Sequence, residues 1–275
     1  MSTILSQMYN ELRCQFFILT GKKPFSKGYP AYKDREIIKV IKNDSFSLKR
    51  LPKGFGYRVD ERIIEYPWLL SRLKEQQELL LDAGSALNID YILSHPVLES
   101  KKIFISTLAP EENCFWKRGI SYIYQDLRST CFQDEYFDSV ASISTLEHIG
   151  LDNSRYIKSS KNGVEKTSGS YIEAVKEIHR ILKVGGKLYI TLPFGEYKNH
   201  SWFQIFNAEM IDELIGAFQP KSCIESHFRY QADGWKVSSR EDSKNAQYFD
   251  YNTQKEFDEN FTVAAGALVC LEFVK

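Results

Sequence analysis

Short apolar segments alternate with stretches of helical periodicity between residues 79 and 191. A strand, a helix and a further strand in succession are typical of a parallel sheet whose faces are covered by helices. The segments predicted as strands are 79–82, 102–107, 121–124, 137–142 and 187–191. The alternation therefore predicts an α/β protein with a doubly wound, mostly parallel sheet.

The C-terminal part of the chain interrupts this alternation. Two more strands are predicted at 222–230 and 264–274, with no convincing helix between them, so they can pair antiparallel. The expected sheet then has seven strands, the last of them antiparallel. Ser170 and Glu173 form the S-x-x-E pattern of a capping box, and Gly185 and Gly186 supply a stop for the helix that begins there.

The N-terminal residues form a different kind of region. Apolar residues recur at helical spacing, which predicts an amphipathic helix that packs on the main domain or on a second subunit: Ile4, Leu5, Met8, Leu12 and Phe16. Residues 21–56 are basic and contain three prolines, and they show no core of their own. We therefore expect an N-terminal helical extension (1–59), a main domain (60–275) and a possible homodimer.

Composition excludes several classes of function. Lys and Arg together equal Asp and Glu at 36 each, so the chain has no overall field for nucleic acid or an anionic membrane. The five cysteines are scattered without a C-x-x-C pair, which indicates neither a disulfide framework nor a metal site. The only early apolar run, 16–19, is too short for a membrane span and lacks a signal-peptide cleavage pattern. The sequence thus predicts a cytoplasmic protein with a small or neutral substrate.

The segment LLLDAGSALN, residues 79–88, raises the question of a cofactor. A cofactor that crosses the end of a strand needs small residues there, and sometimes a positive φ. Gly84 and Ala86 are small, and Asn88 enters the left-handed region readily. A dinucleotide loop, G-x-G-x-x-G, would place glycine where Ile89 stands, which disfavours NAD and FAD. A single-glycine turn after a strand is common, so this segment alone does not decide the question.

Three segments together supply a resemblance. LLLDAGSALN, EYFDSVASISTLEHIG (135–150) and EIHRILKVGGKLYITLPFG (177–195) occur in the order and spacing of class I S-adenosylmethionine-dependent methyltransferases. Over roughly residues 60–275 the chain resembles the subgroup of small-molecule and glycan methyltransferases with LEH after the fourth strand. The resemblance implies S-adenosyl-L-methionine as cofactor. It also implies methyl transfer to a small-molecule acceptor, with a hydroxyl of a sugar, nucleotide-sugar or surface glycan favoured.

The resemblance also implies site residues. Asp82 and Gly84 correspond to the acid and glycine beside the methionine part of the cofactor, and Asp126 to the acid that accepts from the adenine amino group. Ser144 and Leu146 would border the methionine moiety. The full set of expected cofactor-binding residues is Asp82, Gly84, Ser85, Ala86, Asn88, Thr107, Asp126, Leu127, Ser144 and Leu146.

One position departs from the family pattern. Thr107 stands where an acid usually holds the ribose hydroxyls, and Glu111 and Glu112 follow later. Either Glu111 folds back or the ribose is held otherwise. A non-catalytic, cofactor-binding regulatory protein of the same fold therefore remains an alternative, and an NAD-dependent oxidoreductase is a more remote one.

Methyl transfer to a hydroxyl also requires a base. His148, with Glu147 as its orienting partner, follows the fourth strand at the edge where open α/β sheets bind ligands. A structural role for His148, packing and fixing the loop, is the alternative. His200 is a second candidate base, and Tyr197 and Trp202 are candidate substrate-binding residues.

Overall fold

The computed structural model describes residues 3–157 and 164–275 and contains two compact units. The first unit comprises the chain up to Trp68 together with His227–Leu268. The second comprises Leu69–Ser226 and Val269–Lys275. These units differ from the expected 1–59 and 60–275, because residues 227–268 fall with the N-terminal residues. The division into an extension and a methyltransferase domain remains a prediction.

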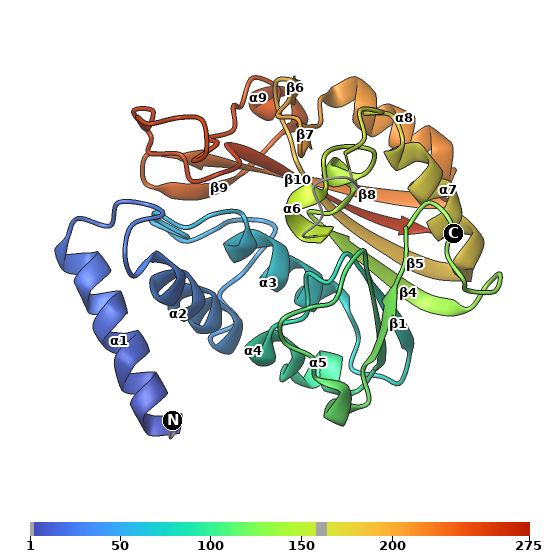
Figure 1. Ribbon diagram of the computed structural model, residues 1–275. Helices are drawn as coiled ribbons and strands as arrows, with labels where there is room; N and C mark the ends of the chain where they lie inside the picture. The colour runs from blue at the N-terminus through green and yellow to red at the C-terminus, as the bar shows by residue number, and fades with distance from the viewer. Residues whose placement is uncertain (1–2, 158–163) are drawn as a thin grey trace. The chain divides into compact units, whose positions relative to one another are not determined.

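The sheet has eight strands in the order β3-β2-β1-β4-β5-β10-β8-β9 (Figure 1). Its strands are β1 (Leu79–Ala83), β2 (Lys102–Thr107), β3 (Ser121–Tyr124), β4 (Phe137–Ile143), β5 (Leu182–Pro193), β8 (Ser222–Gln231), β9 (Gly234–Ser238) and β10 (Ala267–Val274). The pairs β1–β2, β1–β4, β2–β3 and β4–β5 are parallel, whereas β8–β9 is antiparallel. The predicted α/β class and mostly parallel sheet are confirmed. The predicted number of seven strands is wrong, because residues 234–238 fold back on β8 as a hairpin.

The second unit contains five of the helices in the described part of the chain. These are α4 (Asp90–Leu93), α5 (Pro96–Glu99), α6 (Ser154–Ile157), α7 (Tyr171–Ile181) and α8 (Ala208–Phe218). The helices α7 and α8 lie side by side (Figure 1). Their apolar faces join β4 and β5 in one buried cluster, to which Val140, Ile178, Leu188 and Leu214 belong. Burial of this apolar surface is the main term that stabilises the unit.

The boundaries of α7 differ from the sequence prediction. Ser170 has helical backbone and its side chain makes no capping hydrogen bond, so the predicted capping box is absent. The helix also ends before the two glycines, because Leu182 has extended backbone and pairs with Phe137. Gly185 and Gly186 instead lie in an irregular stretch of β5.

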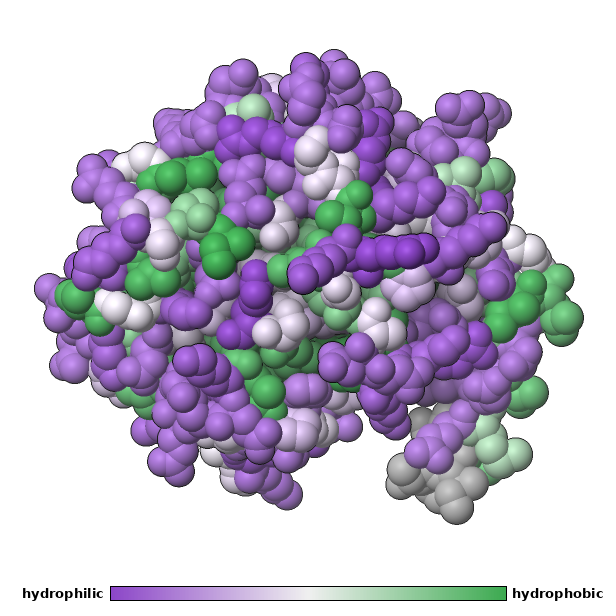
Figure 2. Space-filling view, turned by 180° about the vertical axis from the view of Figure 1, so that it is seen from behind, coloured by the Kyte–Doolittle hydropathy of each residue, from purple (hydrophilic) through white to green (hydrophobic). Residues whose placement is uncertain are grey.

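The first unit contains α1 (Thr3–Leu19), α2 (Tyr29–Lys42), α9 (Arg240–Ser243) and most of α3 (Arg62–Arg72). Cys14 and Phe17 bury one face of α1 against α2, and the Phe17 ring centre lies 4.9 Å from that of Tyr32. The opposite face exposes Leu5, Met8, Leu12, Phe16 and Leu19. Hydrophobic atoms accordingly appear along α1 at the right of Figure 2. The predicted amphipathic helix is confirmed.

Two features of the described residues concern membranes and metals. None of the helices there has both the length and the apolar character needed to cross a membrane. Among the same residues, no group of three or more His, Cys, Asp or Glu side chains is arranged to hold a metal ion.

Candidate active site

The candidate site lies at the carboxyl edge of the parallel strands. Since β1, β2, β3, β4 and β5 run in the same direction, the loops that follow them meet at that edge. The order β3-β2-β1-β4-β5 reverses direction between β1 and β4. Ligands of open α/β sheets bind in the crevice at such a reversal. The loops after β1 and β4 are therefore the first place to look.

Asp82 organises the loop after β1. Its side chain is fully buried, and its carboxylate accepts hydrogen bonds from the backbone N–H groups of Ala86, at 3.2 Å, and Leu87, at 2.8 Å. The Gly84 N–H donates to the Ser106 carbonyl at 2.9 Å, which ties the loop to β2. Asp82 thus shapes the turn from within, a role that the sequence analysis did not assign to it.

Gly84 is required by a contact inside the chain. Its φ is +122°, which L side chains rarely adopt, and an added Cβ would lie 2.0 Å from the Thr145 hydroxyl oxygen. Thr145 follows β4, so the glycine lets the two loops beside the strand reversal close on each other. The sequence analysis attributed the missing side chain to a cofactor, whereas in the structure Thr145 occupies that space.

Ser85 is the residue of this loop that could bind a ligand. Its φ of +66° shows that Ser85, and not Asn88, adopts the left-handed conformation. The Ser85 hydroxyl oxygen is buried without a hydrogen-bond partner among the described residues. A buried hydroxyl without a partner costs free energy that a bound polar group would recover. The loop is therefore suited to a ligand with polar atoms.

Asn88 holds a neighbouring loop in place. Its amide donates to the Asn113 carbonyl at 2.8 Å, and its side-chain oxygen accepts from the Tyr122 hydroxyl at 2.8 Å. The same hydroxyl accepts from the Phe115 N–H at 2.7 Å. Burial raises the pKa of Tyr122, and the nearby charge of Glu111 adds to that shift. Glu111 itself belongs to the loop after β2.

Thr107 ends β2 and is partly buried, with its carbonyl accepting from the Gln125 N–H at 3.0 Å. The acid expected at this point of the family pattern is absent from the strand itself. Glu111, four positions later and partly buried, is the nearest following carboxylate in the chain. It is therefore the candidate for the ribose hydroxyls.

Asp126, expected to accept from adenine, is already bound by an arginine. Arg128 donates to its carboxylate at 2.6 Å and also pairs with Glu165 at 2.6 Å. Although partial burial opposes the shift, the hydrogen bonds from Arg128 lower the pKa of Asp126. The side chain of Leu127 packs in the apolar cluster under α7, which leaves only its backbone for a ligand.

The residues after β4 form a tight turn. Ser144 has a φ of +43°, and its N–H donates to the Thr191 carbonyl at 3.1 Å. Leu146 starts the short 3-10 helix Leu146–His148 and is fully buried in the apolar cluster. Of these two residues, Ser144 is better placed to border a ligand, because the Leu146 side chain points into the core.

His148 is fixed by a backbone carbonyl. Its Nδ1 lies 2.8 Å from the Trp202 carbonyl oxygen, and its Nε2 lies 4.0 Å from a carboxylate oxygen of the buried Glu147. The His148 carbonyl accepts from the Asn153 amide at 3.1 Å, which holds the turn. The structure therefore places the predicted base and its orienting acid together.

Aromatic side chains surround His148 and define what we call the aromatic cluster: His148, Tyr156, His200, Trp202 and Phe203. Three of its members, His200, Trp202 and Phe203, lie between β6 (Lys198–Asn199) and β7 (Gln204–Ile205), which form a hairpin. The loop after β4 joins this hairpin through a hydrogen bond from the Asp152 N–H to the Ser201 carbonyl at 3.0 Å.

The members of the aromatic cluster differ in what they can offer. The His200 ring stacks on Phe203 with centres 4.4 Å apart, which is typical of a packed histidine. The Trp202 ring stacks with His148 at 5.3 Å and carries the Arg155 guanidinium at 4.3 Å from its centre. Tyr197 is 46% exposed and is the more accessible of the two predicted substrate-binding residues.

Sequence reasoning missed Thr145, Arg155 and Tyr156. Arg155 and Tyr156 belong to the polar stretch between β4 and α7, where composition indicates a loop but not which residues return to the site. Thr145 stands between the conspicuous serine and LEH. Its role depends on the distance to Gly84 across the sheet, which no local pattern displays.

Comparison with known proteins adds a family. Residues 101–190, which are 90 of the 275 residues and run from β2 into β5, match the family described as "Methyltransferase domain". The match includes Asp126 and the LEH segment but not the loop around Gly84. No curated protein matches this chain.

Solved structures of similar fold include enzymes of this type. One is the 1,6-didemethyltoxoflavin N1-methyltransferase of Burkholderia thailandensis with 1,6-didemethyltoxoflavin and S-adenosylhomocysteine, at 14% identity and a TM-score of 0.46, covering 77% of this chain and 75% of that one. Another is a possible histamine N-methyltransferase of Thermotoga maritima, at 15% identity and a TM-score of 0.46, covering 77% and 88%.

Fold and family match agree on the type of domain. The parallel sheet with antiparallel final strands is the arrangement that the sequence resemblance implied. The matched segment supplies four of the parallel strands and the loops that carry Asp126 and His148. Residues 101–190 thus match a methyltransferase domain, which is the type of domain that the resemblance of the sequence to class I S-adenosylmethionine-dependent methyltransferases implied.

Proposed function

We propose that the enzyme methylates a hydroxyl of a sugar or nucleotide-sugar, with His148 as general base. The observation that supports this most is the hydrogen bond from His148 Nδ1 to the Trp202 carbonyl oxygen at 2.8 Å. A carbonyl only accepts, so Nδ1 carries the proton, and in the neutral ring Nε2 is then the basic nitrogen. Glu147, 4.0 Å from Nε2, stabilises the ring after it gains a proton.

The residues of the loop after β1 fit the cofactor. Ser85 offers a buried hydroxyl without a partner among the described residues, and the partly buried Glu111 after β2 would offer a carboxylate for the ribose hydroxyls. Asp126 would accept from the adenine amino group beside Arg128. When bound, S-adenosylmethionine supplies an electrophilic methyl group on a sulfonium, a good leaving group.

The base acts on the acceptor. Nε2 of His148 would take the proton of the acceptor hydroxyl as the hydroxyl oxygen bonds to the methyl carbon. Bound S-adenosylmethionine would supply that methyl group and would keep the carbon–sulfur electron pair on its sulfur. The proton remains on the imidazole, balanced by Glu147, and leaves to solvent. The protein mainly holds the acceptor in line and close, which accounts for much of the acceleration in such displacements.

Arg155 favours a nucleotide-sugar among hydroxyl acceptors. Its guanidinium lies over Trp202, whose ring stacks with His148, so a positive charge stands beside the proposed base. Arginine binds phosphate oxygens with paired hydrogen bonds. A diphosphate held there would bring the attached sugar to the aromatic cluster, where the exposed Tyr197 offers a surface.

A non-catalytic, cofactor-binding protein is the second candidate, and two contacts favour it. Thr145 fills the space beside Gly84, and Arg128 occupies the carboxylate of Asp126. Both contacts reduce what the loops offer to a ligand. Such a protein would bind S-adenosylhomocysteine without transferring methyl groups.

Turnover with a panel of acceptors separates these candidates. Purified protein with S-adenosylmethionine is given nucleotide-sugars, free sugars and amines, and methylated products are detected by mass spectrometry. His148→Ala should lower turnover about 10²- to 10⁴-fold with S-adenosylhomocysteine affinity preserved. His200→Ala is the matched control and should lower it far less, because that ring is packed on Phe203. Full activity of His148→Ala would remove the assigned base, and methylation of amines alone would exclude a hydroxyl acceptor.

We also infer that α1 mediates a homodimer. Its exposed stripe recurs every three or four residues, which is the spacing of helices that pair along a seam. Leu12 and Leu19 are 68% and 84% exposed. Light scattering should show a dimer that Leu12→Lys dissociates and the exposed control Gln7→Lys does not. A monomeric wild type would refute this inference.

A further inference from the structure

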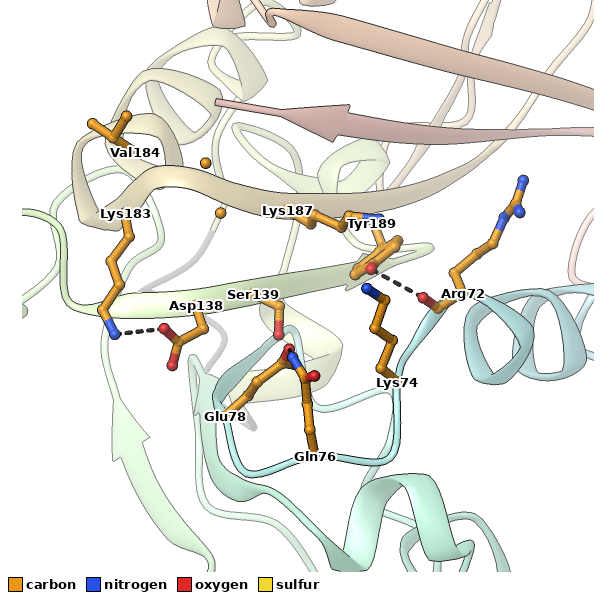
Figure 3. Close-up of a pocket in the computed structure, with 12 residues that line it drawn as sticks. Arg72, Lys74, Gln76, Glu78, Asp138, Ser139, Lys183, Val184, Lys187 and Tyr189 are labelled. Carbon is orange, nitrogen blue, oxygen red and sulfur yellow. Dashed lines mark hydrogen bonds and ion pairs between the residues drawn. The ribbon is translucent and has the colours of Figure 1, made fainter.

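A cavity lies at the opposite, amino edge of the parallel strands. It has a volume of about 310 Å³ and is bordered by the segment before β1, the start of β4 and the irregular part of β5 (Figure 3). All of its lining residues belong to the second unit: Arg72, Lys74, Gln76, Glu78, Asp138, Ser139, Lys183, Val184, Gly185, Gly186, Lys187 and Tyr189. Its size is at the lower end of pockets that bind metabolites.

The cavity carries an excess of positive charge. Four lining residues are cationic and two are acidic. Asp138 is neutralised within the chain, since one carboxylate oxygen accepts from Lys183 and the other from the Leu79 N–H at 2.8 Å. Glu78 is likewise paired, with the fully buried Lys101 at 3.0 Å. Both acidic side chains of the cavity are therefore already paired with lysines of the chain.

Two further cations share one acid. Glu272, which is buried, pairs with Lys187 at 2.6 Å and with Arg72 at 3.3 Å. The ammonium of Lys74 makes no hydrogen bond or ion pair with any described residue, and its side chain extends into the cavity in Figure 3. An anion entering the cavity would therefore meet a net positive charge.

A buried hydroxyl supplies the second observation. Ser139 is only 3% exposed, and its hydroxyl oxygen has no hydrogen-bond partner among the described residues. In Figure 3 it points toward the loop that carries Gln76 and Glu78, which is the interior of the cavity. A buried hydroxyl without a partner is unfavourable, and a ligand oxygen would satisfy it. Ser139 pairs with Lys187 in the sheet register, so the hydroxyl and a cation project side by side.

We propose that this cavity binds a small organic phosphate. A phosphate group can accept from Ser139 and Lys74 at once, and lysines are common phosphate ligands. The oxygens that remain face Lys187. The site stands at the other end of the strands from the aromatic cluster, so it is separate from the methyl-transfer site and does not depend on the acceptor proposed above.

Calorimetry with inorganic phosphate and glycerol phosphate tests the proposal, with sodium chloride at matched ionic strength as the salt control. Phosphate should bind, and Lys74→Glu and Ser139→Ala should each weaken binding about tenfold or more. Ser139→Ala should fold as well as the wild type, because it removes a hydroxyl that has no partner. Lys176→Glu, at an exposed lysine of α7, is the matched charge control and should bind phosphate normally.

Several results would overturn the proposal. They are absence of binding beyond the salt control, unchanged affinity in Lys74→Glu or Ser139→Ala, and binding of citrate without phosphate, which would assign the cavity to carboxylates. Competition between phosphate and S-adenosylhomocysteine would place the phosphate at the methyl-transfer site instead. Simultaneous binding of the two supports a separate site.

Discussion

The two edges of the parallel strands differ in how their side chains are used. At the carboxyl edge the loops close on one another, with Thr145 against Gly84 and Arg128 on Asp126. At the amino edge the chain leaves a cavity lined by charges, in which Lys74 and Ser139 have no partner among the described residues. Each edge therefore keeps a buried hydroxyl without a partner among the described residues, Ser85 at the carboxyl edge and Ser139 at the amino edge, but the contacts that close the loops on one another are found at the carboxyl edge.

This contrast shows that partner contacts, more than residue type, indicate where a ligand is needed. Asp126 has the right chemistry for adenine but is already bound, whereas Ser139 is chemically ordinary but buried without a partner. The cost of an unsatisfied buried group is what makes such an atom informative. Substitutions of Gly84 and Asp126 would show how tightly the carboxyl edge is closed.

The largest expected effect is that of Gly84→Ala. The new Cβ would overlap the Thr145 side chain and force alanine to a φ of +122°, so we expect a loss of about 3 kcal/mol in the free energy of unfolding. Urea unfolding measures it. Gly119→Ala is the matched control, because Gly119 has a φ of +78° but open space around its Cβ. It should cost only about 1 kcal/mol. Equal losses for the two variants would show that Thr145 does not close on the glycine.

Asp126→Ala should weaken S-adenosylhomocysteine binding by roughly tenfold, the effect of losing one hydrogen bond to a charged group. Titration calorimetry measures the affinity. Asp138→Asn, at the amino edge, is the control. It should bind S-adenosylhomocysteine normally, since the Asp138 carboxylate accepts hydrogen bonds from Lys183 and the Leu79 N–H, far along the strands from the carboxyl edge. If a folded Asp126→Ala binds as well as the wild type, the carboxylate serves only to hold Arg128.

The smallest effect is a difference in acid sensitivity. The pKa of Asp126 is lowered by Arg128 and that of Asp138 by Lys183, in each case against partial burial. A lowered folded-state pKa contributes stability above the unfolded pKa, and this is lost as pH falls through the folded value. The urea midpoint should therefore fall less for Asp126→Asn and Asp138→Asn than for the wild type between about pH 5 and about pH 3. Both pairs are partly exposed, so the differences will be modest. If the urea midpoint of both variants falls with pH as steeply as that of the wild type, the lowered pKa values are contradicted.

The sequence predicted the strands well and the turns poorly. Strand positions follow from short apolar runs, so β1 to β4 were placed to within one residue. The end of α7 was misplaced because Leu182 pairs with Phe137, a contact 45 residues away in sequence. The hairpin that adds β9 was missed because its five residues, GWKVS, are a short run of mixed polarity at the edge of the sheet.

For the site, the sequence predicted which residue types are present but not which side chains already contact one another. His148 and Glu147 were found from their position after β4, and the structure places them together. That Thr145 fills the space beside Gly84, or that Arg128 binds Asp126, depends on distances that sequence spacing does not determine. Ser139 carries no sequence signal, since a serine in a strand is common and only its burial sets it apart.

The strand order has one more consequence, for cleavage of the chain. β10 lies between β5 and β8, although it follows all the other strands along the sequence. A protease cut or a premature stop that removes Ala267–Val274 would therefore delete an interior strand and open two new edges. Exposed edges of apolar strands invite pairing between molecules. Shortened forms of this protein should therefore aggregate and not persist as smaller folded enzymes.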